Sequence, residues 1–346
     1  MKNPALRVVL AFCVVATTVA GCSGSQGSTI PVGGPFFKLN TAATSRDQKS
    51  GNAATSSEDF VYFSYGSCSL YTGGCYAEVA TYTFPGGQPI GTWNAAGYAL
   101  GECADKAGNV FVTYILGSVG EILEFAHGST SPVATLSDPT GLPVACSADP
   151  ISGDLAVVNA SNGMEALLIY SNASGSPTTY SYPGVTFYSV SYDNKGNVFV
   201  DGLKGYRSSQ QFVLAELPRG GKSFENTGLN EQIDGPGELD WNGKYLAIGP
   251  LYPGQNRVDR FDIRGGSGHF VGATQPRRIR GGIDQYWILG KQIVIAYSWK
   301  PCRAICGDEG TAGIWYYPSG HVITKSITPD GGPSTGMALS IAQTHR

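Results

Sequence analysis

The stretch DNKGNVFV, Asp193 to Val200, has a near copy earlier in the chain, DKAGNVFV, Asp105 to Val112. Three fainter copies follow the same plan: DPISGDLAVV from Asp149, DWNGKYLAIG from Asp240 and LGKQIVIAY from Leu289. Each copy has a polar turn built on glycine and then an alternating apolar run, which indicates a tight turn leading into a β-strand. Successive turn glycines are 45, 43, 47 and 47 residues apart: Gly108, Gly153, Gly196, Gly243 and Gly290. A nearly fixed spacing of roughly 20–50 residues predicts a repeat architecture.

Each repeat is predicted to contain four strands. The quoted stretch gives the end of the first strand and all of the second, and a glycine-rich turn separates the third strand from the fourth. The third strands align in six copies: EVATY from Glu78, EILEF from Glu121, ALLIY from Ala166, VLAEL from Val213, VDRF from Val258 and GIWYY from Gly313. Six third strands predict six sheets.

The composition agrees with an all-β chain. Among 346 residues there are 48 Gly, 20 Pro and 19 Tyr, and only 14% of residues are charged, a balance that favours turns and strands over helices. The formal net charge of −3 argues against a nucleic-acid-binding protein, which normally carries a basic stripe. The repeats favour one domain, because each copy needs a neighbour to bury its faces.

Six four-stranded units of this length resemble a β-propeller with repeats of the NHL type, over about residues 58–343. The chain also resembles a group of bacterial propeller lipoproteins that carry the same GNVFV phrase, a resemblance that supplies no activity. We therefore expect an all-β fold, a six-bladed β-propeller with four-stranded blades. Radial repetition of this kind leaves only short, protected sheet edges.

The first blade lacks its first strand in sequence order. DFVYFSYGS from Asp59 matches the second strand of the repeat, and only a polar segment precedes it. Residues 335–342, near the other end of the chain, alternate like a first strand with no second strand after them. We expect this C-terminal strand to complete the first blade and remove a sheet edge; the alternative is a disordered tail.

The N-terminus has the pattern of a targeting segment. Lys2 and Arg7 precede an apolar run at 8–20, and Val19-Ala20-Gly21-Cys22 resembles the lipobox of bacterial lipoproteins. The resemblance implies a signal peptide at 1–21 and acylation of Cys22, hence a lipid-anchored protein of the cell envelope. Ser23 after the cysteine favours the outer membrane by the same analogy. The alternatives are an ordinary signal peptide and a transmembrane helix, which needs roughly 20 apolar residues.

Residues 22–57 are rich in Ser, Gly, Thr, Ala and Asn and show no strand or helix period. This composition predicts a flexible tether. The propeller domain is then expected at 58–346.

The number of cysteines suggests disulfides but leaves fifteen possible pairings. Once Cys13 leaves with the signal peptide and Cys22 carries lipid, six remain, an even number that suggests disulfides in an exported protein. We expect the pairs Cys68–Cys75, Cys103–Cys146 and Cys302–Cys306. A zinc site starting at Cys302-x3-Cys306 is the alternative, but no histidine stands near it.

The inner strands of a propeller line its central channel, where candidate binding residues are expected. Counted from the turns, Glu102 and Asp284 occupy matching positions and Glu238 is offset by one; Tyr188 and Tyr286 lie on or beside the same strands. Converging carboxylates could bind Ca²⁺ or act as acid and base, as in the gluconolactonase-like propellers, which use a channel metal. The alternative is that the acids are hydrated at the channel mouth.

Two further groups are expected to be solvated. His127, His269 and His321 fall at or near turns, and nothing arranges them around a metal or a serine nucleophile. Arg277, Arg278 and Arg280 form a basic cluster before the sixth blade, which could meet an anionic polymer or lipid headgroups.

The sequence thus predicts a propeller lipoprotein that acts as a binding or scaffold module, without a resident cofactor. Its partners would be the membrane, through the lipid, and a protein, peptide or glycan ligand; we expect no nucleic acid and a monomer. The alternative is a metal-dependent lactonase or lyase with its site in the channel. No motif identifies the ligand.

Cys22→Ala should abolish acylation and membrane retention, because residues 23–57 offer no other apolar anchor. Labelling with a fatty acid and fractionation of cells would measure both. Recovery of the processed variant in the membrane fraction would contradict the prediction.

Overall fold

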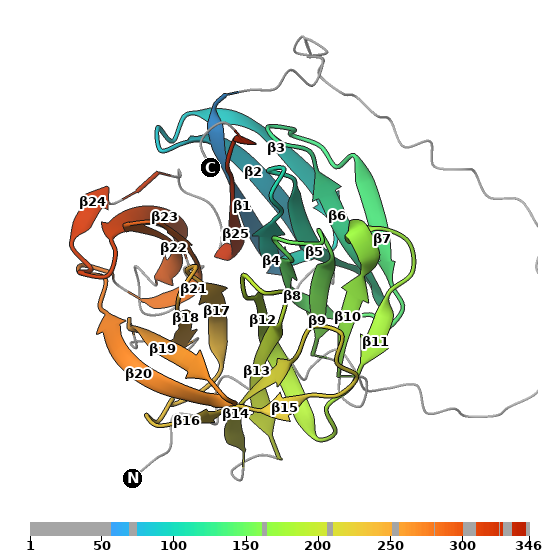
Figure 1. Ribbon diagram of the computed structural model, residues 1–346. Helices are drawn as coiled ribbons and strands as arrows, with labels where there is room; N and C mark the ends of the chain where they lie inside the picture. Colours follow the sequence, from blue (N-terminus) through green and yellow to red (C-terminus); the bar gives the residue numbers. More distant parts are fainter. Residues whose placement is uncertain are drawn as a thin grey trace, which may run out of the picture. The chain divides into compact units, whose positions relative to one another are not determined.

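The computed structural model describes residues 57–68, 75–160, 165–205, 210–250, 256–279, 281–299, 309–324, 326–327 and 334–343. The expected signal peptide, Cys22, the tether up to residue 56 and the pair Cys302–Cys306 lie outside these ranges. The described part is an all-β propeller of six sheets arranged around an axis (Figure 1). Within it, no helix is long and apolar enough to cross a membrane.

The first three blades have four strands each, named from the axis outward. Blade one contains β25 (Ser334–Ser340), β1 (Asp59–Cys68), β2 (Cys75–Phe84) and β3 (Pro89–Ala96). Blade two contains β4 (Tyr98–Ala104), β5 (Val110–Leu116), β6 (Val119–Phe125) and β7 (Ala134–Asp138). Blade three contains β8 (Pro143–Ala148), β9 (Leu155–Asn159), β10 (Ala166–Tyr170) and β11 (Thr178–Tyr180), with a short 3₁₀ turn, η3 (Ser171–Ala173), between the last two.

The other three blades follow the same order. Blade four contains β12 (Val185–Tyr192), β13 (Val198–Lys204), β14 (Gln211–Leu217) and β15 (Glu225–Asn226). Blade five contains β17 (Gly237–Trp241), β18 (Leu246–Pro250), β19 (Val258–Arg264) and β20 (Ser267–Thr274), and it gains a short fifth strand, β16 (Gly228–Leu229), parallel to β20. Blade six contains β21 (Gly282–Leu289), β22 (Gln292–Trp299), β23 (Glu309–Tyr316) and β24 (Val322–Thr324).

The C-terminal strand completes the first blade, as expected. β25 pairs antiparallel with β1, from Phe60 opposite Ser340 to Phe63 opposite Met337. The backbone N–H of Ala342 donates a 2.8 Å hydrogen bond to the Asp59 carboxylate just beyond the paired region. The two ends of the domain are therefore held together by a strand pair rather than by a covalent bond.

The repeated turn phrase has a local cause. In the DNKGN turn, Asp193 Oδ1 accepts the backbone N–H groups of Lys195 and Asn197, and Oδ2 accepts the Asn197 side-chain amide. The DKAGN turn after β4 repeats the same three bonds from Asp105. Gly196 takes a φ of +83° in this turn, which an L side chain rarely adopts. Aspartate, asparagine and glycine recur because they close this hairpin.

The core lies between blades rather than inside one sheet. Six clusters of buried apolar residues each join two neighbouring blades. The alternation of side chains along a strand explains this: Val157 packs toward blade two and Val158 toward blade four. The second strand of each blade thus contributes side chains to two of these cores.

The closing strand contributes to the core on both of its faces. Met337, Leu339 and Ile341 pack between blades one and six, and all three are buried. Ala338, on the opposite face, packs toward blade two. His127 was expected to be solvated, and this was wrong: its Nδ1 lies 2.6 Å from Ser340 Oγ, a contact between blade two and the closing strand.

Deletion of residues 335–346 should destabilise the whole domain. Burial of a large aliphatic side chain is worth about 1.5–3 kcal/mol, so three of them are a large share of a typical stability of about 5–15 kcal/mol. The double variant Leu339→Asp/Ile341→Asp should do nearly as much damage. Thermal unfolding followed by circular dichroism measures this, and an unchanged melting temperature in the deletion would contradict the closure.

Candidate functional site: the propeller channel

Irregularities in the inner strands shape the channel. A bulge interrupts the register of β8 at Val144, of β12 at Tyr188, of β21 at Asp284 and of β25 at Thr335, and the bulge in β4 spans two residues, Leu100 and Gly101. β17 is regular. Bulges of this kind redirect side chains and are frequent beside functional sites. Each one lies in the first half of its strand, so together they mark one end of the channel.

Residues at the bulges form one layer across the channel with the matching residue of β17. Four of them directly follow a bulge residue, and Gly101 is the second bulge residue of β4. The layer contains Gly336, Gly101, Ala145 and Ser189 on blades one to four, and Glu238 and Gln285 on blades five and six. Four small residues therefore face two long polar ones. A Cβ on Gly101 would lie 2.6 Å from the Val144 carbonyl oxygen, and one on Gly336 would overlap the Leu100 carbonyl. The glycines allow the inner strands to approach closely.

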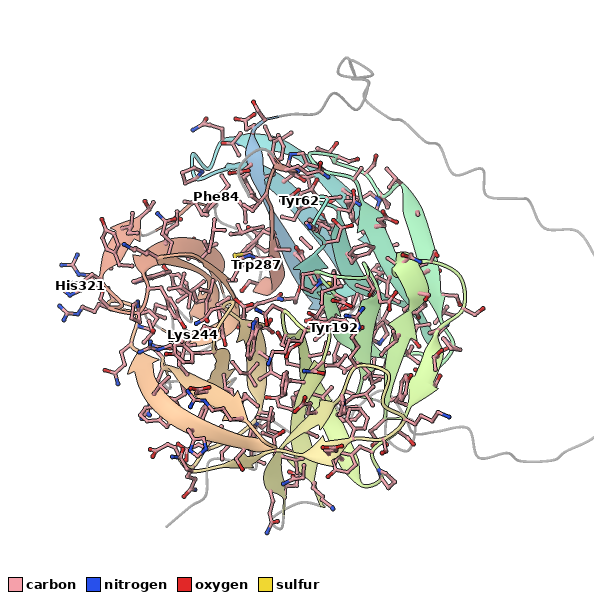
Figure 2. All side chains as sticks on the ribbon, in the orientation of Figure 1. Tyr62, Phe84, Tyr192, Lys244, Trp287 and His321 are labelled. Carbon is pink, nitrogen blue, oxygen red and sulfur yellow. A yellow bond between two sulfur atoms is a disulfide. The ribbon has the colours of Figure 1, made fainter. Side chains whose placement is uncertain are left out.

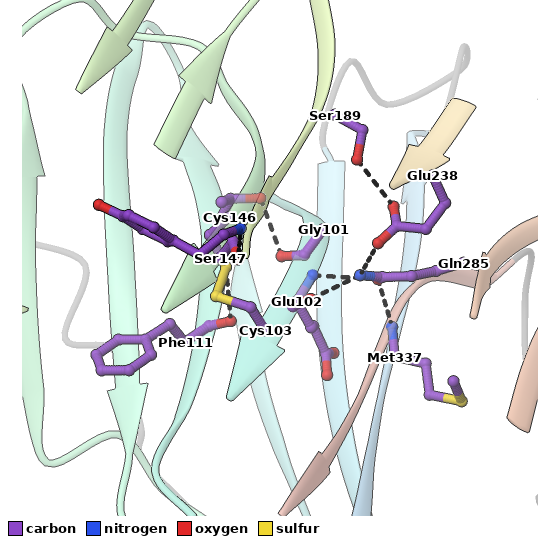
Figure 3. Close-up of a disulfide and its surroundings, with 12 residues drawn as sticks. Gly101, Glu102, Cys103, Phe111, Cys146, Ser147, Ser189, Glu238, Gln285 and Met337 are labelled. Carbon is purple, nitrogen blue, oxygen red and sulfur yellow. Dashed lines mark hydrogen bonds between the residues drawn. A yellow bond between two sulfur atoms is a disulfide. The ribbon is translucent and has the colours of Figure 1, made fainter. Parts of the chain in front are cut away.

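Gln285 crosses this layer and joins four blades (Figure 3). Its side-chain N–H groups donate to the Glu102 carbonyl at 2.6 Å and to Glu238 Oε1 at 3.3 Å. Its Oε1 accepts the backbone N–H groups of Met337 at 2.8 Å and Glu102 at 3.2 Å. Both donors and both lone pairs of the amide are thereby used. The residue is buried and ties the inner strands of these blades together at this level.

Glu238 is held beside Gln285. Ser189 Oγ donates to Glu238 Oε2 at 3.4 Å and accepts the Leu239 backbone N–H at 3.0 Å. Burial raises the pKa of the Glu238 carboxyl well above its ordinary value, and the nearby charge of Asp240 adds to the effect.

Glu102 points between blades one and two. Ser64, on β1, donates a short hydrogen bond to Glu102 Oε1, while Oε2 is buried and has no partner within the described part of the chain. Burial raises the pKa of the Glu102 carboxyl to about 8. The alternative that the channel acids are hydrated is wrong for Glu102, which is buried between neighbouring blades; Glu238 is half-buried.

Asp284 does not share the environment of Glu102, contrary to the count from the turns. Asp284 is the bulge residue of β21, whereas Glu102 lies opposite Val112 in the register of β4 and β5. The Asp284 carboxylate accepts hydrogen bonds from Ser298, at 2.6 Å, and from Ser334. Turn lengths and bulges differ between blades, so equal distances from a glycine do not give equal positions.

The two candidate tyrosines have different surroundings. Tyr286 is buried, and its hydroxyl donates to the Glu238 carbonyl at 3.0 Å. Desolvation raises its pKa, so it remains a neutral donor. Tyr188 is the bulge residue of β12 and is half-buried. Among the residues that the structure describes, no three His, Cys, Asp or Glu side chains are grouped to hold a metal.

Two residues of the network escaped the sequence reasoning. Gln285 lies between the two candidates Asp284 and Tyr286, and it was missed because the candidates were chosen among acids and tyrosines. Asp201, at the end of the GNVFV phrase, is fully buried and accepts the N–H groups of Ser189 at 3.0 Å and Gly237 at 2.7 Å. A charged residue directly after a buried apolar run was the signal that could have found it.

A disulfide joins the inner strands of blades two and three beside this layer (Figure 3). Cys103 and Cys146 are bonded, with 5.6 Å between their Cα atoms, and both are buried. This expected pair is confirmed. Cys68 and Cys75 lie opposite one another in the β1–β2 register, so their pairing stays a prediction that the backbone permits.

Glu102→Gln should reduce the loss of stability with rising pH. The unfolded carboxyl loses its proton near its ordinary pKa of 4.5, whereas the folded one keeps it up to about 8. The folded state of the unmodified protein is therefore progressively penalised as pH rises through this window, by about 1.4 kcal/mol per pKa unit.

The measurement is the melting temperature of each protein at pH 5 and pH 8. The unpaired amide of the variant costs the same at both values, so the gain of the variant at pH 8 relative to pH 5 isolates the titration. Glu58→Gln, at an exposed position, is the control. Equal pH dependence in the two variants would contradict the buried carboxyl.

Comparisons with known proteins bear on the fold. The chain matches no protein-family model and no curated protein. The solved structures it resembles include a nidogen/laminin complex, with 11% identity, a TM-score of 0.50 and coverage of 82% of this chain and 99% of the other. They also include TolB from Acinetobacter baumannii, with 14% identity, a TM-score of 0.53 and coverage of 82% and 66%. At these identities the likeness shows the fold alone: the chain is a β-propeller.

Proposed function

We propose that this protein is a binding module of the bacterial cell envelope, anchored by lipid on Cys22, whose propeller docks a partner protein on one face. The lipobox-like sequence at residues 19–22 supports the anchor, and Ser23 favours the outer membrane. The docking face is the one on which the hairpins between second and third strands emerge. The observation that carries the proposal is that the acids of the channel are engaged in hydrogen bonds within the protein.

A channel enzyme needs open space and available ligands on the axis. Here Gln285 is hydrogen-bonded to three other blades. Each side chain of the expected carboxylate set is engaged by a hydrogen bond: Glu102 by Ser64, Glu238 by Gln285 and Asp284 by Ser298. Binding on the outside of the propeller requires none of these bonds to break. The packing therefore favours a binding module over a lactonase or lyase that uses Ca²⁺ in the channel.

The docking face exposes large apolar side chains, which we name the apolar rim: Tyr76, Leu116 and Val119. Their exposed fractions are 46%, 49% and 53%. Leu116 and Val119 are opposite one another at the tip of the β5–β6 hairpin. Tyr76 pairs with Ala96, whose carbonyl accepts a hydrogen bond from Tyr114 of β5, so the hairpins of blades one and two adjoin. Exposed apolar groups gathered at one place mark interaction surfaces.

A protein partner fits this surface because amphipathic tyrosine and aliphatic groups with a polar surround are typical of protein interfaces. The nidogen propeller that shares the fold was solved in a complex with another protein, laminin. This precedent supports the use of the architecture as a docking platform.

A photo-crosslinking amino acid at position 119, introduced into intact cells, should give a discrete adduct of higher mass. Leu116→Asp should weaken that adduct several-fold, because a charge would be buried at the interface. The matched control is position 151: Ile151 is equally apolar and 49% exposed, but it lies in the β8–β9 turn at the opposite face.

Adducts at position 151 as strong as those at 119, or no adduct at either, would contradict the docking face. Metal analysis of the purified protein separates the competing function. One tightly held divalent ion per chain, lost on Glu238→Gln, would favour a metal enzyme in the channel.

A further inference from the structure

Positive charge is concentrated in one part of this weakly acidic chain. Six of its twelve arginines fall between residues 257 and 280: Arg257, Arg260, Arg264, Arg277, Arg278 and Arg280. The described ones belong to the outer strands of blade five and to the connection into blade six. A local excess of arginine favours contact with an anion, provided that the guanidinium groups face a common space.

Two of them do. A surface cavity of about 610 Å³ is lined by Arg257, Ala273, Gln275, Pro276, Arg277 and Ser319. Its walls come from the start of β19, the end of β20, the connection after it and the turn between β23 and β24. Cavities that hold small ligands typically measure about 300–1,000 Å³. The outer rim between blades five and six is thus hollowed where two arginines meet.

Arg257 is oriented by two contacts. Its Nε donates to Asp259 Oδ1 at 2.6 Å, and its guanidinium lies 5.4 Å from the centre of the Phe270 ring. Only the Nε–H is engaged by the carboxylate, so the terminal nitrogens remain for a ligand. A guanidinium held in place loses less entropy when it binds a planar or tetrahedral oxyanion.

The backbone of Arg277 is fixed to blade six from both sides. Its N–H donates to the Gly320 carbonyl at 2.9 Å, and its carbonyl accepts the Trp315 indole N–H at 3.0 Å. Among the described residues no carboxylate pairs with its side chain. A Cβ at Gly320 would overlap the Gln275 carbonyl, so the turn of blade six presses directly on the cavity wall. This part of the cavity is rigid.

The two segments are also tied to one another. The side-chain amide of Asn256, next to Arg257, donates to the Ile279 carbonyl at 3.4 Å. Arg278 adopts a φ of +70°, a conformation that is costly for a non-glycine residue and is often found where function requires it. Both features hold the arginine-bearing connection against the start of β19.

We propose that this cavity is an oxyanion-binding site, in which Arg257 and Arg277 bind the phosphate or carboxylate groups of a small polyanion and Ser319 and Gln275 add polar contacts. Arginine suits this role because its fork of N–H donors matches the oxygens of phosphate and carboxylate. The site is distinct from the apolar rim, so the proposal goes beyond the proposed docking of a protein. Failure of the anion-binding proposal would leave the docking proposal standing.

The experiment is a titration of the full-length protein in detergent with inorganic pyrophosphate and, separately, with citrate, by calorimetry at constant ionic strength. We expect saturable binding that weakens as NaCl rises. Arg277→Ala and Arg257→Ala should each weaken it at least 10-fold, and Arg277→Lys less, since lysine keeps the charge but not the fork. Binding of pyrophosphate alone assigns a phosphate site, and binding of citrate alone a carboxylate site.

The matched control is Arg264→Ala. Arg264 is the last residue of β19, the strand that begins directly after Arg257. Arg264 is exposed, pairs with Asp262 and does not line the cavity, so its removal should leave the affinity within 2-fold. Circular dichroism confirms that each variant is folded. The proposal is overturned if neither anion binds saturably at millimolar concentration, or if Arg264→Ala weakens binding as much as Arg277→Ala.

Discussion

The ring of blades depends on the pairing of β25 with β1. Each inner strand contacts the inner strand of the next blade, and β25 contacts both β4 and β21, so the circle is complete only when the last strand of the chain is in place. Its buried side chains Met337, Leu339 and Ile341 belong to the core shared with blade six, and Ala338 to the core shared with blade two. Contacts that are distant in sequence thus determine whether the repeats form a closed domain.

Closure also dictates what occupies the axis. Six inner strands converge, and close approach on one side is possible only because Gly101 and Gly336 carry no side chain. Glu238 and Gln285 extend toward the axis from the other side (Figure 3). Because the polar atoms of Gln285 find partners on other blades, the amide stabilises the ring where an unpaired polar group would weaken it. Burial raises the pKa of the Glu102 and Glu238 carboxyls for a related reason: it removes the solvent that would stabilise their charge.

The hydrogen bonds that engage the channel acids favour binding on the outside of the propeller. Among the exposed side chains of the described residues are those of the apolar rim on blades one and two and those of the arginine-lined cavity between blades five and six. Figure 2 shows charged side chains extending outward near His321 of blade six, while Trp287 and Tyr192 lie toward the interior. A propeller used in this way is a scaffold whose surfaces can bind different ligands independently. Function of this kind resides in surface residues that the fold itself does not constrain.

The sequence by itself determined the architecture, because turn chemistry and strand alternation are local. The propeller was predicted from the Asp–Gly turns at residues 105–109 and 193–197 and from the six third strands. Its closure was predicted from the unmatched strand at 335–342. It also suggested the Cys103–Cys146 bond, since both cysteines fall on first strands of neighbouring repeats. These features depend on residues within one repeat or on counting repeats.

Only the tertiary structure decided the channel and the surface cavity. The bulges at Asp284 and Tyr188 shift the register by single residues, so counting from the turns placed Glu102 and Asp284 together when they are apart. Gln285 gains partners that are distant in sequence, Glu102 at 183 residues and Met337 at 52 residues, on two other blades. Arg257 and Arg277 meet only because the turn of blade six packs against the last outer strand of blade five. Sequence periodicity records which face a side chain takes, but the neighbours on that face are set by how the blades close into a ring.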